Sequence, residues 1–350
     1  MKIGVYTDIH CCYTSSILPI HCESSTYTTR LQMIIDTFRW MYDIFEQQEV
    51  DFIVNCGDLF DSCNVRSEEI SALAKALSYS QGTPEYHILG NHDTLDKRRY
   101  FYSTALLSGF PYIEIIDNPT KLNNGVSFLP YMEADKAQEI LGCLQNDILF
   151  SHLDIQGSRL NQFKVLEEGT DPKALSNLFK LVINGHIHSY QRIKSNVYNI
   201  GSTTSLSFSD NSDYCPGITI VDTDSFDILR ISNPYAIRFI KFNFKDLNKS
   251  QCLSYLDSKL PNITNKVVLK IDCKGELKEM LAQYVGNFEN VLTCRVIGYG
   301  CPATESGSEV IQAATKDNVV TSLDHFLSGC DDLKYSLDIY KQIIKRYVET

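Results

Sequence analysis

Short apolar runs recur along the first half of the chain, and each of them ends in a cluster of polar residues. The runs are Ile3–Tyr6, Phe52–Val54, Tyr86–Leu89, Ile148–Phe150 and Leu181–Ile183. Between the first three runs, apolar residues recur at helical spacing over Thr29–Glu49 and Ser67–Tyr79. Buried strands that alternate with amphipathic helices are typical of α/β proteins with a mainly parallel sheet.

The same pattern predicts further strands and then a separate unit. Strands are expected at 113–116, 126–129, 197–200 and 217–222, and a helix at 172–179. Ser232-Asn233-Pro234 breaks the pattern, and beyond it the order strand, helix, strand, helix, strand over 238–297 predicts a compact βαβαβ unit. Residues 300–320 are rich in Gly, Pro, Ser and Thr and resemble a linker. We therefore divide the chain into 1–232, 233–299 and 300–350.

Composition places the chain among globular proteins of more than one domain. Of its 350 residues, 43% are hydrophobic, and no run approaches the roughly 20 apolar residues that cross a bilayer. Met1-Lys2-Ile3 leads directly into a strand and not into a signal peptide, so we expect a cytoplasmic protein without membrane association.

The twelve cysteines are scattered, which favours reduced thiols over a disulfide framework. Cys11, Cys12, His21 and Cys22 form the one local cluster that resembles a zinc site. It lacks a cysteine pair with two-residue spacing, and ordinary loop packing is the preferred interpretation.

The formal charge of −11 argues against broad, nonspecific nucleic-acid binding. The charge is unevenly distributed, because residues 1–235 hold 17 basic and 29 acidic side chains whereas 236–350 hold 15 and 14. Two divalent metal ions would return four positive charges to the acidic part. Acidity therefore weakens a nucleic-acid hypothesis without excluding it.

Five polar motifs follow the apolar runs directly. They are Asp8-Ile9-His10, Gly57-Asp58-Leu59-Phe60-Asp61, Gly90-Asn91-His92-Asp93, Ser151-His152 and Gly185-His186-Ile187-His188. Open α/β sheets place their sites at the carboxyl ends of strands, which is where all five motifs are expected. Any one motif arises often by chance, but five in succession predict a shared site.

The residue types predict a pair of divalent metal ions, which need a bridging carboxylate and a mixture of imidazole and oxygen ligands. Asp58, on a glycine turn between the other motifs, is the expected bridge. We expect Asp8, His10 and His188 to complete one metal site, and Asn91, His152 and His186 to complete the other. This ligand mixture suits Mn, Fe or Zn better than Mg or Ca.

Three further residues are expected to serve the chemistry without binding metal. His92 adjoins a predicted ligand, and its free imidazole is suited to protonate a leaving alkoxide. Asp93 is expected to orient His92, and Asp61 to support a ligand from outside the metal site.

Lys97-Arg98-Arg99 is the densest basic cluster of the first half. It has two interpretations of similar weight, a solvated helix face and a phosphate-positioning cluster beside the site.

At these motifs the chain resembles calcineurin-like metallophosphoesterases, over roughly residues 1–230. The segment Asn199–Asp210 and the strand Gly217–Asp222 also resemble the SbcD family of nuclease subunits in DNA double-strand-break repair, and in size the T-even type of phage recombination endonuclease subunit. The resemblance implies a metallophosphoesterase β-sandwich flanked by helices, with a small α/β capping domain for DNA recognition and C-terminal helices. Cys11-Cys12 and Thr203 depart from the family pattern, outside the predicted ligands.

The same resemblance implies two Mn²⁺ ions, with Mg²⁺, Fe²⁺ or Zn²⁺ as other metals, and exonuclease and endonuclease activity on DNA. It also implies a homodimer that works with a coiled-coil ABC ATPase of the SbcC type, in a heterotetramer in the cytoplasm, or the host cytoplasm if a phage encodes the chain. Two alternatives remain: another phosphoesterase, acting on phosphomonoesters or cyclic nucleotides, or a non-catalytic scaffold.

The apolar stripe of residues 331–348 predicts a docking helix for that ATPase within 322–350. The alternative is a helix that folds back on its own domain.

Overall fold

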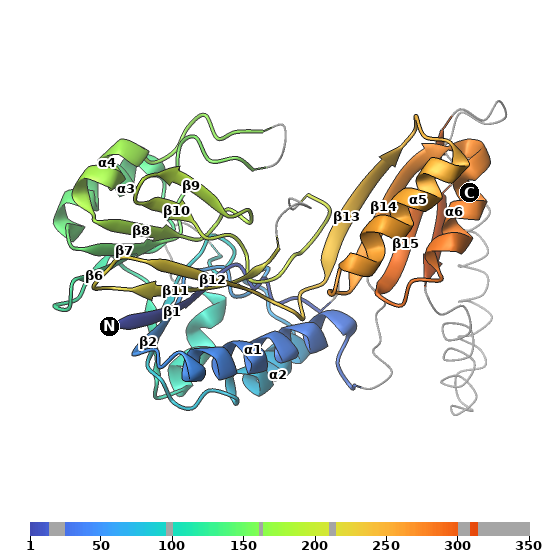
Figure 1. Cartoon of the computed structure of the whole chain (residues 1–350). Coiled ribbons are helices and arrows are strands. Elements are labelled where there is room, and N and C mark those ends of the chain that lie inside the picture. Colours follow the sequence, from blue (N-terminus) through green and yellow to red (C-terminus); the bar gives the residue numbers. More distant parts are fainter. Residues whose placement is uncertain (14–24, 96–100, 161–163, 210–214, 300–308, 314–350) are drawn as a thin grey trace.

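The computed structural model describes residues 1–13, 25–95, 101–160, 164–209, 215–299 and the backbone of 309–313. Figure 1 shows two lobes, the first built around two sheets and the second around a third. The predicted DNA-contacting residues Lys97, Arg98 and Arg99 and the predicted docking segment 322–350 lie outside the described residues.

The first lobe contains two six-stranded sheets with parallel centres. The first sheet has the order β12 (Ile228–Ser232), β11 (Gly217–Asp222), β1 (Lys2–Tyr6), β2 (Phe52–Asn55), β3 (Glu85–Ile88) and β4 (Ile113–Ile116). The second has the order β5 (Thr120–Lys121), β6 (Val126–Leu129), β7 (Ile148–Ser151), β8 (Leu181–Asn184), β10 (Val197–Asn199) and β9 (Gln191–Lys194). Strands β1 to β4 run parallel, as do β6, β7, β8 and β10.

The two sheets are joined face to face by a shared apolar core. Ile3, Val5 and Val54 of the first sheet belong to one buried cluster with Phe128 and Phe150 of the second. Because these strands are covered on both faces, they read as continuous apolar runs in the sequence. The predicted α/β sandwich is confirmed.

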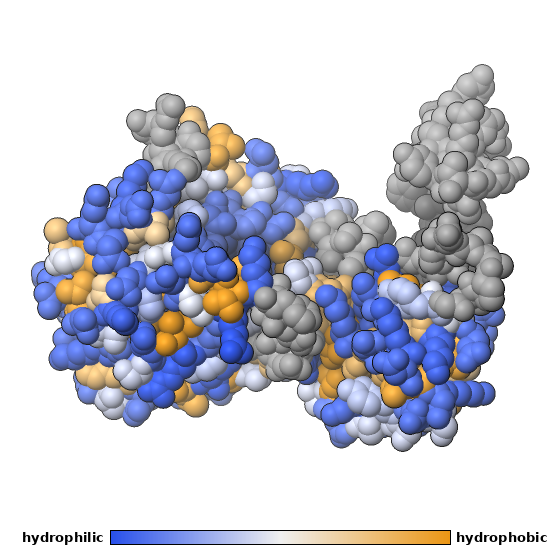
Figure 2. All heavy atoms as spheres, turned by 90° about the horizontal axis from the view of Figure 1, so that it is seen from above, coloured by the Kyte–Doolittle hydropathy of each residue, from blue (hydrophilic) through white to orange (hydrophobic). Residues whose placement is uncertain are grey.

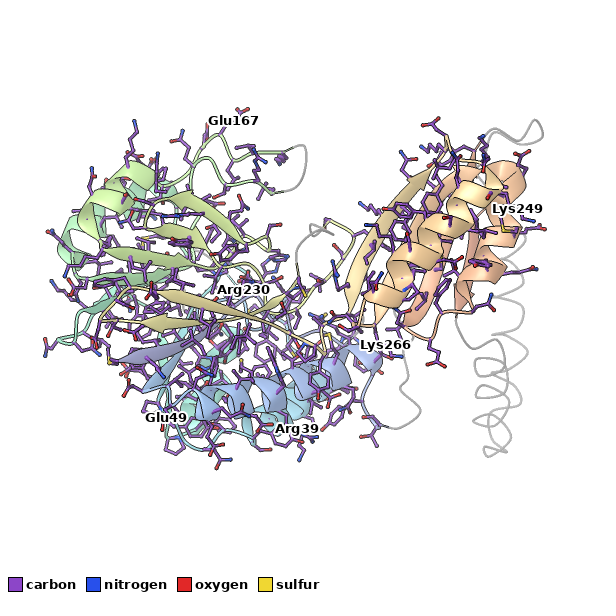
Figure 3. The ribbon with its side chains drawn as sticks, viewed as in Figure 1. Arg39, Glu49, Glu167, Arg230, Lys249 and Lys266 are labelled. Carbon is purple, nitrogen blue, oxygen red and sulfur yellow. The ribbon has the colours of Figure 1, made fainter. Side chains whose placement is uncertain are left out.

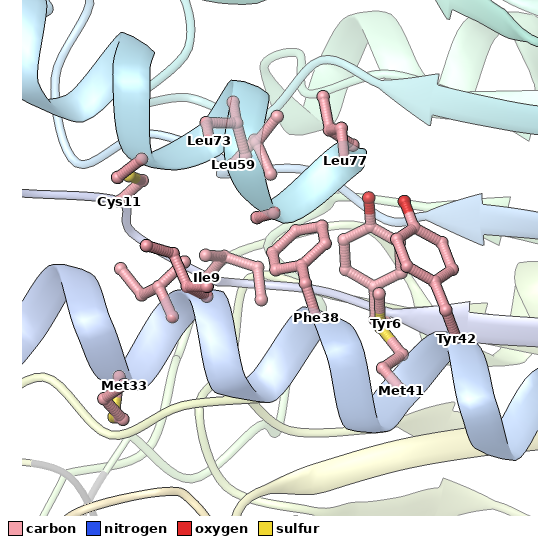
Figure 4. Packing of buried hydrophobic residues seen from close by; sticks show 14 of the residues in the cluster. Tyr6, Ile9, Cys11, Met33, Phe38, Met41, Tyr42, Leu59, Leu73 and Leu77 are labelled. Atoms are coloured by element: carbon pink, nitrogen blue, oxygen red, sulfur yellow. The ribbon is translucent and has the colours of Figure 1, made fainter. Parts of the chain in front are cut away.

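Helices cover the outer face of each sheet. Helices α1 (Thr29–Gln47) and α2 (Ser67–Leu77) cover the first sheet, and α3 (Ala134–Ile140) and α4 (Pro172–Leu178) cover the second. Figure 4 shows Phe38 of α1 between Tyr6 of β1 and residues of α2. Thr28 caps α1 by accepting the Leu31 amide at 3.2 Å. Helix α1 ends two residues before its predicted limit because Glu49 adopts a left-handed φ of 54°.

The second lobe is a third sheet with helices on one face. Strands β13 (Arg238–Phe244), β14 (Val267–Lys274) and β15 (Val291–Tyr299) run parallel. Helices α5 (Lys249–Lys259) and α6 (Lys278–Val285) cover the face that carries Ile240, Phe242 and Ile271. These five elements match the order predicted from the sequence.

The structure corrects part of the segment expected to be a linker. Residues Glu309–Ala313 form strand β16, which pairs antiparallel with β15. The added strand satisfies the backbone groups of an otherwise unpaired edge. Gly, Pro and Ser residues dominate the composition of segment 300–320, so its sequence pattern does not predict this five-residue strand.

Apolar and polar contacts both join the lobes. Ile237, Phe239 and Val268 belong to the same buried cluster as Phe38 of the first lobe. Asn265 Nδ2 donates to the carbonyls of Asn233 at 2.9 Å, Pro234 at 3.2 Å and Ala236 at 2.9 Å. Asn233 Nδ2 in turn donates to Thr37 Oγ1 and to the Thr203 carbonyl, both at 3.0 Å. The break predicted at Ser232–Pro234 is therefore a hydrogen-bonded joint.

The outer surface is mostly hydrophilic on the face seen in Figure 2, with apolar residues scattered among polar ones. Among the described residues, no helix combines the length and apolar character that crossing a membrane requires.

We predict that Asn265→Ala lowers the free energy of unfolding by about 1–3 kcal/mol, because buried carbonyls lose their donor. The matched control is Asn262→Ala, since the Asn262 amide is exposed and donates to one carbonyl, that of Ser258, at 2.7 Å. We expect the control to stay within about 0.5 kcal/mol of the wild type. Urea titration of the two variants measures both values, and equal losses would contradict a role for the Asn265 joint.

Candidate metal centre

The five predicted motifs converge at one end of the sandwich. Backbone hydrogen bonds continue beyond the strands and align the loops: Asp8 N donates to Gly57 O, and His10 N to Asp58 O, both at 3.0 Å. Gly185 N donates to Ser151 O at 2.9 Å in the second sheet. Because parallel strands end at the same edge, residues far apart in sequence become neighbours here.

The first group of candidate ligands comprises Asp8, His10 and His188. The Nε2 atoms of His10 and His188 are 3.0 Å apart, and each lies 3.8 Å from Asp8 Oδ1. Asp8 Oδ2 accepts the Thr7 hydroxyl at 2.7 Å and the His186 amide at 3.0 Å. Asp8 Oδ1 is buried and has no hydrogen-bond partner among the described residues. This oxygen therefore faces the imidazoles with a free lone pair.

The second group comprises Asp58, His152 and His186, with Asn91 beside it. His152 Nε2 lies 3.2 Å from Asp58 Oδ2, 3.0 Å from Asn91 Oδ1 and 3.2 Å from His186 Nδ1. One imidazole nitrogen cannot satisfy three polar atoms, so these atoms are expected to share a cation. Two ligands at right angles around an ion with bonds of roughly 2.1 Å lie about 3 Å apart, which matches the observed separations.

Asp58 lies between the two groups. Its Oδ2 is 3.9 Å from His10 Nε2 and 3.2 Å from His152 Nε2, while its Oδ1 accepts the His92 amide at 2.9 Å. The position is that of a carboxylate able to bridge two ions.

Two imidazoles are oriented by an acceptor on their outer nitrogen. His152 Nδ1 faces the Cys56 carbonyl at 2.6 Å, and His186 Nε2 faces Asp154 Oδ1 at 2.9 Å. An acceptor at one nitrogen holds the proton there and leaves the other nitrogen as a lone pair directed at the candidate site. Asp61 Oδ1 lies 3.2 Å from His10 Nδ1 at an ion-pair distance, without a hydrogen bond between the two atoms.

The backbone at the site adopts a conformation that side chains disfavour. Asp8, His10, Asp58 and His186 have φ values of 51°, 47°, 54° and 70°. Left-handed φ at residues other than glycine costs of order 1–3 kcal/mol each and is found at sites where the surroundings enforce it. Of the six such residues in the described chain, four are candidate ligands.

Close approach explains two glycines of the motifs. A Cβ at Gly90 would lie 2.0 Å from Asp58 Oδ1, and a Cβ at Gly57 would lie 2.3 Å from His152 Nδ1. Gly57 also has a φ of 102°. Any larger residue would displace the central carboxylate or the central imidazole.

The electrostatics of the centre are dominated by its buried charges. Burial raises the pKa of Asp58, but the imidazoles of His152, His10 and His92 outweigh it and hold the pKa well below its usual range. Burial lowers the pKa of His152, but Asp58 and Asp8 overcome this effect and raise it to about 9. The pocket therefore favours positive charge beside Asp58, which is the environment that a divalent ion occupies.

Asp93 has a different role from the one expected. Its carboxylate is fully buried and accepts the amides of Asp58 and Gly90 at 2.9 Å and of Phe60 at 3.3 Å. Burial, and then the charge of Asp58, raise the pKa of Asp93 to about 6. His92 Nδ1 instead lies 2.8 Å from the Asp61 carbonyl. Asp93 braces the ligand loops, and Asp61 orients His92 through its backbone.

Sequence reasoning missed two supporting residues. Asp154 holds His186, and its position two residues after His152 is the only sequence signal for this role. Arg30 of α1 is fully buried and donates to the carbonyls of Ile9 at 2.7 Å, His10 at 3.1 Å and Ser205 at 2.9 Å. The buried guanidinium of Arg30 thus fixes the loop that carries His10. No short sequence motif predicts this role.

Comparison with known proteins defines the class of this chain. Residues 1–190 match the family model described as calcineurin-like phosphoesterase. The match covers more than half of the chain, and the chain therefore belongs to the calcineurin-like phosphoesterase family. Members of this family bind divalent metals, in agreement with the two candidate ligand groups.

Particular relatives include viral, archaeal and bacterial proteins. Putative phosphoesterase 244L of Invertebrate iridescent virus 6 is 27% identical over 198 residues, which are 51% of this chain and 67% of that protein. The DNA double-strand break repair protein Mre11 of Sulfurisphaera tokodaii is 31% identical over 125 residues, covering 33% and 32% of the two chains. A subunit of the nuclease SbcCD from Staphylococcus epidermidis is 26% identical over 220 residues, covering 53% and 58%. The matches thus span from 32% to 67% of the length of these relatives.

Among solved structures, TT1561 of Thermus thermophilus is similar to this chain with a TM-score of 0.41 and 11% identity. The likeness covers 66% of this chain and 98% of that one.

We predict that Asp154→Ala weakens divalent metal binding by about 10- to 100-fold, because His186 loses the carboxylate that fixes its ring. Titration calorimetry with Mn²⁺ measures the change. The matched control is Asp171→Ala, which removes an exposed carboxylate that caps α4 by accepting the Lys173 amide at 2.9 Å. Native metal affinity in Asp154→Ala would contradict the orienting role.

Proposed function

We propose that this chain is the nuclease subunit of an SbcD-type complex and hydrolyses phosphodiester bonds of DNA with two metal ions. The observation that carries the proposal is the Asp58 carboxylate, which faces both ligand groups at once. The proposed ligands are Asp8, His10 and His188 for one ion and Asn91, His152 and His186 for the other.

In the proposed hydrolysis, the metal ions and the residues of the chain have different roles. Two bound Mn²⁺ ions would stabilise the charge that develops on a phosphoryl group and lower the pKa of a water molecule. Carboxylate, imidazole and amide ligands also suit Fe²⁺ or Zn²⁺. The residues of the chain position the ligand atoms, fix the proposed bridging carboxylate of Asp58 and place a proton donor beside it.

His92 is the proposed proton donor. Its side chain is exposed, its amide is held by Asp58 Oδ1 at 2.9 Å, and its Nδ1 is held by the Asp61 carbonyl at 2.8 Å. The ring is therefore fixed close to the bridge, with Nε2 available to protonate the oxygen that leaves. The His10 and His92 rings meet edge to face with centroids 4.8 Å apart, which limits rotation of His92.

Two of the relatives support DNA as the substrate. They are named as a double-strand break repair protein and as a nuclease subunit. Within the proposal, Lys97, Arg98 and Arg99 position the DNA backbone, residues 1–232 form the nuclease domain and 233–299 the capping domain. A dimer of the chain works with an SbcC-type ATPase in the cytoplasm, with residues 322–350 as the docking element.

Cleavage assays test the proposal directly. Linear duplex DNA, single-stranded DNA, a chromogenic phosphodiester and a chromogenic phosphomonoester are each incubated with Mn²⁺, with and without an SbcC-type ATPase. Asp58→Asn, which removes the charge from the proposed bridge, is the inactive control. Preference for the phosphomonoester, or no cleavage of DNA under any of these conditions, would contradict a nuclease.

We predict that His92→Ala retains both metal ions but cleaves phosphodiesters about 100- to 10,000-fold more slowly, because it lacks the proton donor. Metal content is measured by elemental analysis, and turnover is measured with linear duplex DNA, whose leaving group is a sugar alkoxide. The chromogenic phosphodiester has a more acidic leaving group that needs less protonation, so the variant should recover part of the lost rate with that substrate. Loss of either ion, or wild-type turnover, would remove His92 from this role.

A further inference from the structure

The last residues of three parallel strands in the second sheet form a buried polar row. They are Ser151 of β7, Asn184 of β8 and Asn199 of β10, and each is fully buried. The strand register places Ser151 and Asn199 on either side of Asn184. Because side chains alternate along a strand, the row shares a face with the residues two positions earlier, which belong to the apolar core beneath α3 and α4. Those residues are Leu149, Val182 and Val197.

The side-chain amide of Asn184 uses both of its ends in hydrogen bonds. Its Oδ1 accepts the Ser151 hydroxyl at 2.7 Å and the Leu153 amide at 2.8 Å. Its Nδ2 donates to the carbonyls of Leu153 at 2.9 Å and Gly185 at 2.8 Å, and to Asn199 Oδ1 at 2.9 Å. A backbone amide only donates and a backbone carbonyl only accepts, so these partners fix which way the side-chain amide points.

These hydrogen bonds join the two loops that carry the histidines of the second ligand group. Leu153 directly follows His152, and Gly185 directly precedes His186. Asn184 binds both the N–H and the C=O of Leu153, as the main chain of a neighbouring strand would. The side chain of Asn184 therefore continues the pairing of the sheet beyond the end of β7.

The segment after β7 depends on this pairing for its position. The chain leaves the sheet after β7 and returns before α4, and Figure 3 shows Glu167 of this segment near the top of the first lobe. The two ends of the segment meet where the Thr170 amide donates to the Asp154 carbonyl at 2.8 Å. Asn184 holds Leu153, the residue before this point, against the sheet.

The contact between Asp154 and His186 lies between the two groups that Asn184 holds. Asp154 Oδ1 is 2.9 Å from His186 Nε2. Asp154 follows Leu153, and His186 follows Gly185. One amide side chain thus fixes the backbone next to both partners of the contact that orients His186.

The apolar surroundings show what the amide adds at position 184. Burying an amide in an apolar environment costs free energy unless its polar atoms are hydrogen-bonded. A leucine of similar size would extend the adjacent core without this cost. The hydrogen bonds of Asn184 to Leu153 and Gly185 are what leucine lacks, and they act on the ligand loops.

We propose that Asn184 is a positioning residue of the metal centre, which orients His186 by holding Leu153 and Gly185 in a fixed arrangement. It acts through the contact between Asp154 and His186 and touches neither metal nor substrate. The inference rests on the ligand groups of the proposed function, and it does not depend on DNA being the substrate.

The test compares two buried amides of the same row. Asn184→Leu removes the hydrogen bonds to the ligand loops. Asn199→Leu is the matched control, because Asn199 Nδ2 donates to Ser158 Oγ at 2.9 Å and the bonds of Asn184 to Leu153 and Gly185 do not involve it. Both variants should unfold at lower urea concentration than the wild type, since each loses buried hydrogen bonds. Stability alone therefore does not distinguish them.

The first readout is the imidazole of His186 in the metal-free protein, followed by proton–nitrogen NMR. A proton on Nε2 that Asp154 holds exchanges slowly with water and gives a visible signal. We expect this signal in the wild type and in Asn199→Leu, and we expect its loss in Asn184→Leu. A general loss of stability would affect both variants alike.

The second readout is Mn²⁺ affinity, measured by titration calorimetry. We expect Asn184→Leu to weaken binding by about tenfold, at the lower end of what disturbed support of a metal ligand costs. Asn199→Leu should match the wild type. In the Asp154→Ala background, Asn184→Leu should weaken binding by no more than about twofold further, because residues that act through one contact are not additive.

Several outcomes would overturn the role of Asn184. They are losses that multiply in the double variant, an unchanged His186 signal in Asn184→Leu, or equal effects of the two leucine variants. If Asn184→Leu does not fold, Asn184→Ala replaces it, since the smaller side chain leaves room for water beside the freed polar groups. The same directions are expected for Asn184→Ala. If neither variant folds, Asn184 serves the whole fold and the specific role is rejected.

The outcomes also separate this inference from the proposed function. A wild type that binds no Mn²⁺ contradicts the proposed ligand groups, while the metal-free NMR spectra still decide whether Asn184 orients His186. A wild type that binds Mn²⁺ but cleaves no DNA contradicts the nuclease and leaves the role of Asn184 standing.

Discussion

The concentration of carboxylates and imidazoles around Asp58 is the constraint on which the rest of this structure depends. Asp8, Asp58 and Asp93 are buried together at the edge of the sandwich, where unpaired charge is costly unless a cation compensates it. The surrounding fold meets this requirement with backbone amides, oriented imidazoles and a buried guanidinium. Asp93 is the clearest case, because its carboxylate fixes the backbone of both Asp58 and Gly90.

The strained backbone of the site is held by hydrogen bonds between its loops. Asp8, His10, Asp58 and His186 keep a left-handed φ because these hydrogen bonds fix the course of the loops. Gly57 and Gly90 permit the close approach that those loops require. A site held in this way is arranged before any ion or substrate arrives, and binding then costs little reorganisation.

The sequence predicts those features that depend on short, continuous stretches of the chain. Each apolar run and the motif behind it could be assigned because strands buried on both faces have a simple pattern and the ligand residues follow them directly. The structure also brings the candidate ligands together in the expected groups. Adjacency in the sequence suggests that Asp93 contacts His92, whereas its carboxylate binds the amide of Gly90 in its own loop and those of Asp58 and Phe60 in another. Arg30 and Asp154 contact residues that are distant in the sequence, and β16 forms by pairing with the edge of β15. A short stretch of sequence does not reveal contacts of this kind.

The pairing of the first strand has a consequence for the order of events during synthesis. Strand β1, which delivers Asp8 and His10, pairs with β2 on one side and with β11 on the other, where Lys2 meets Asp222. At ribosomal speeds of about 5–20 residues per second, β11 emerges roughly ten to forty seconds after β1. Until then the strand has one unsatisfied edge, and the last two candidate ligands, at the end of β8, precede the closing strand. Over this interval the nascent chain therefore exposes an unpaired strand edge beside acidic loops, and such an edge is a template for pairing with other chains.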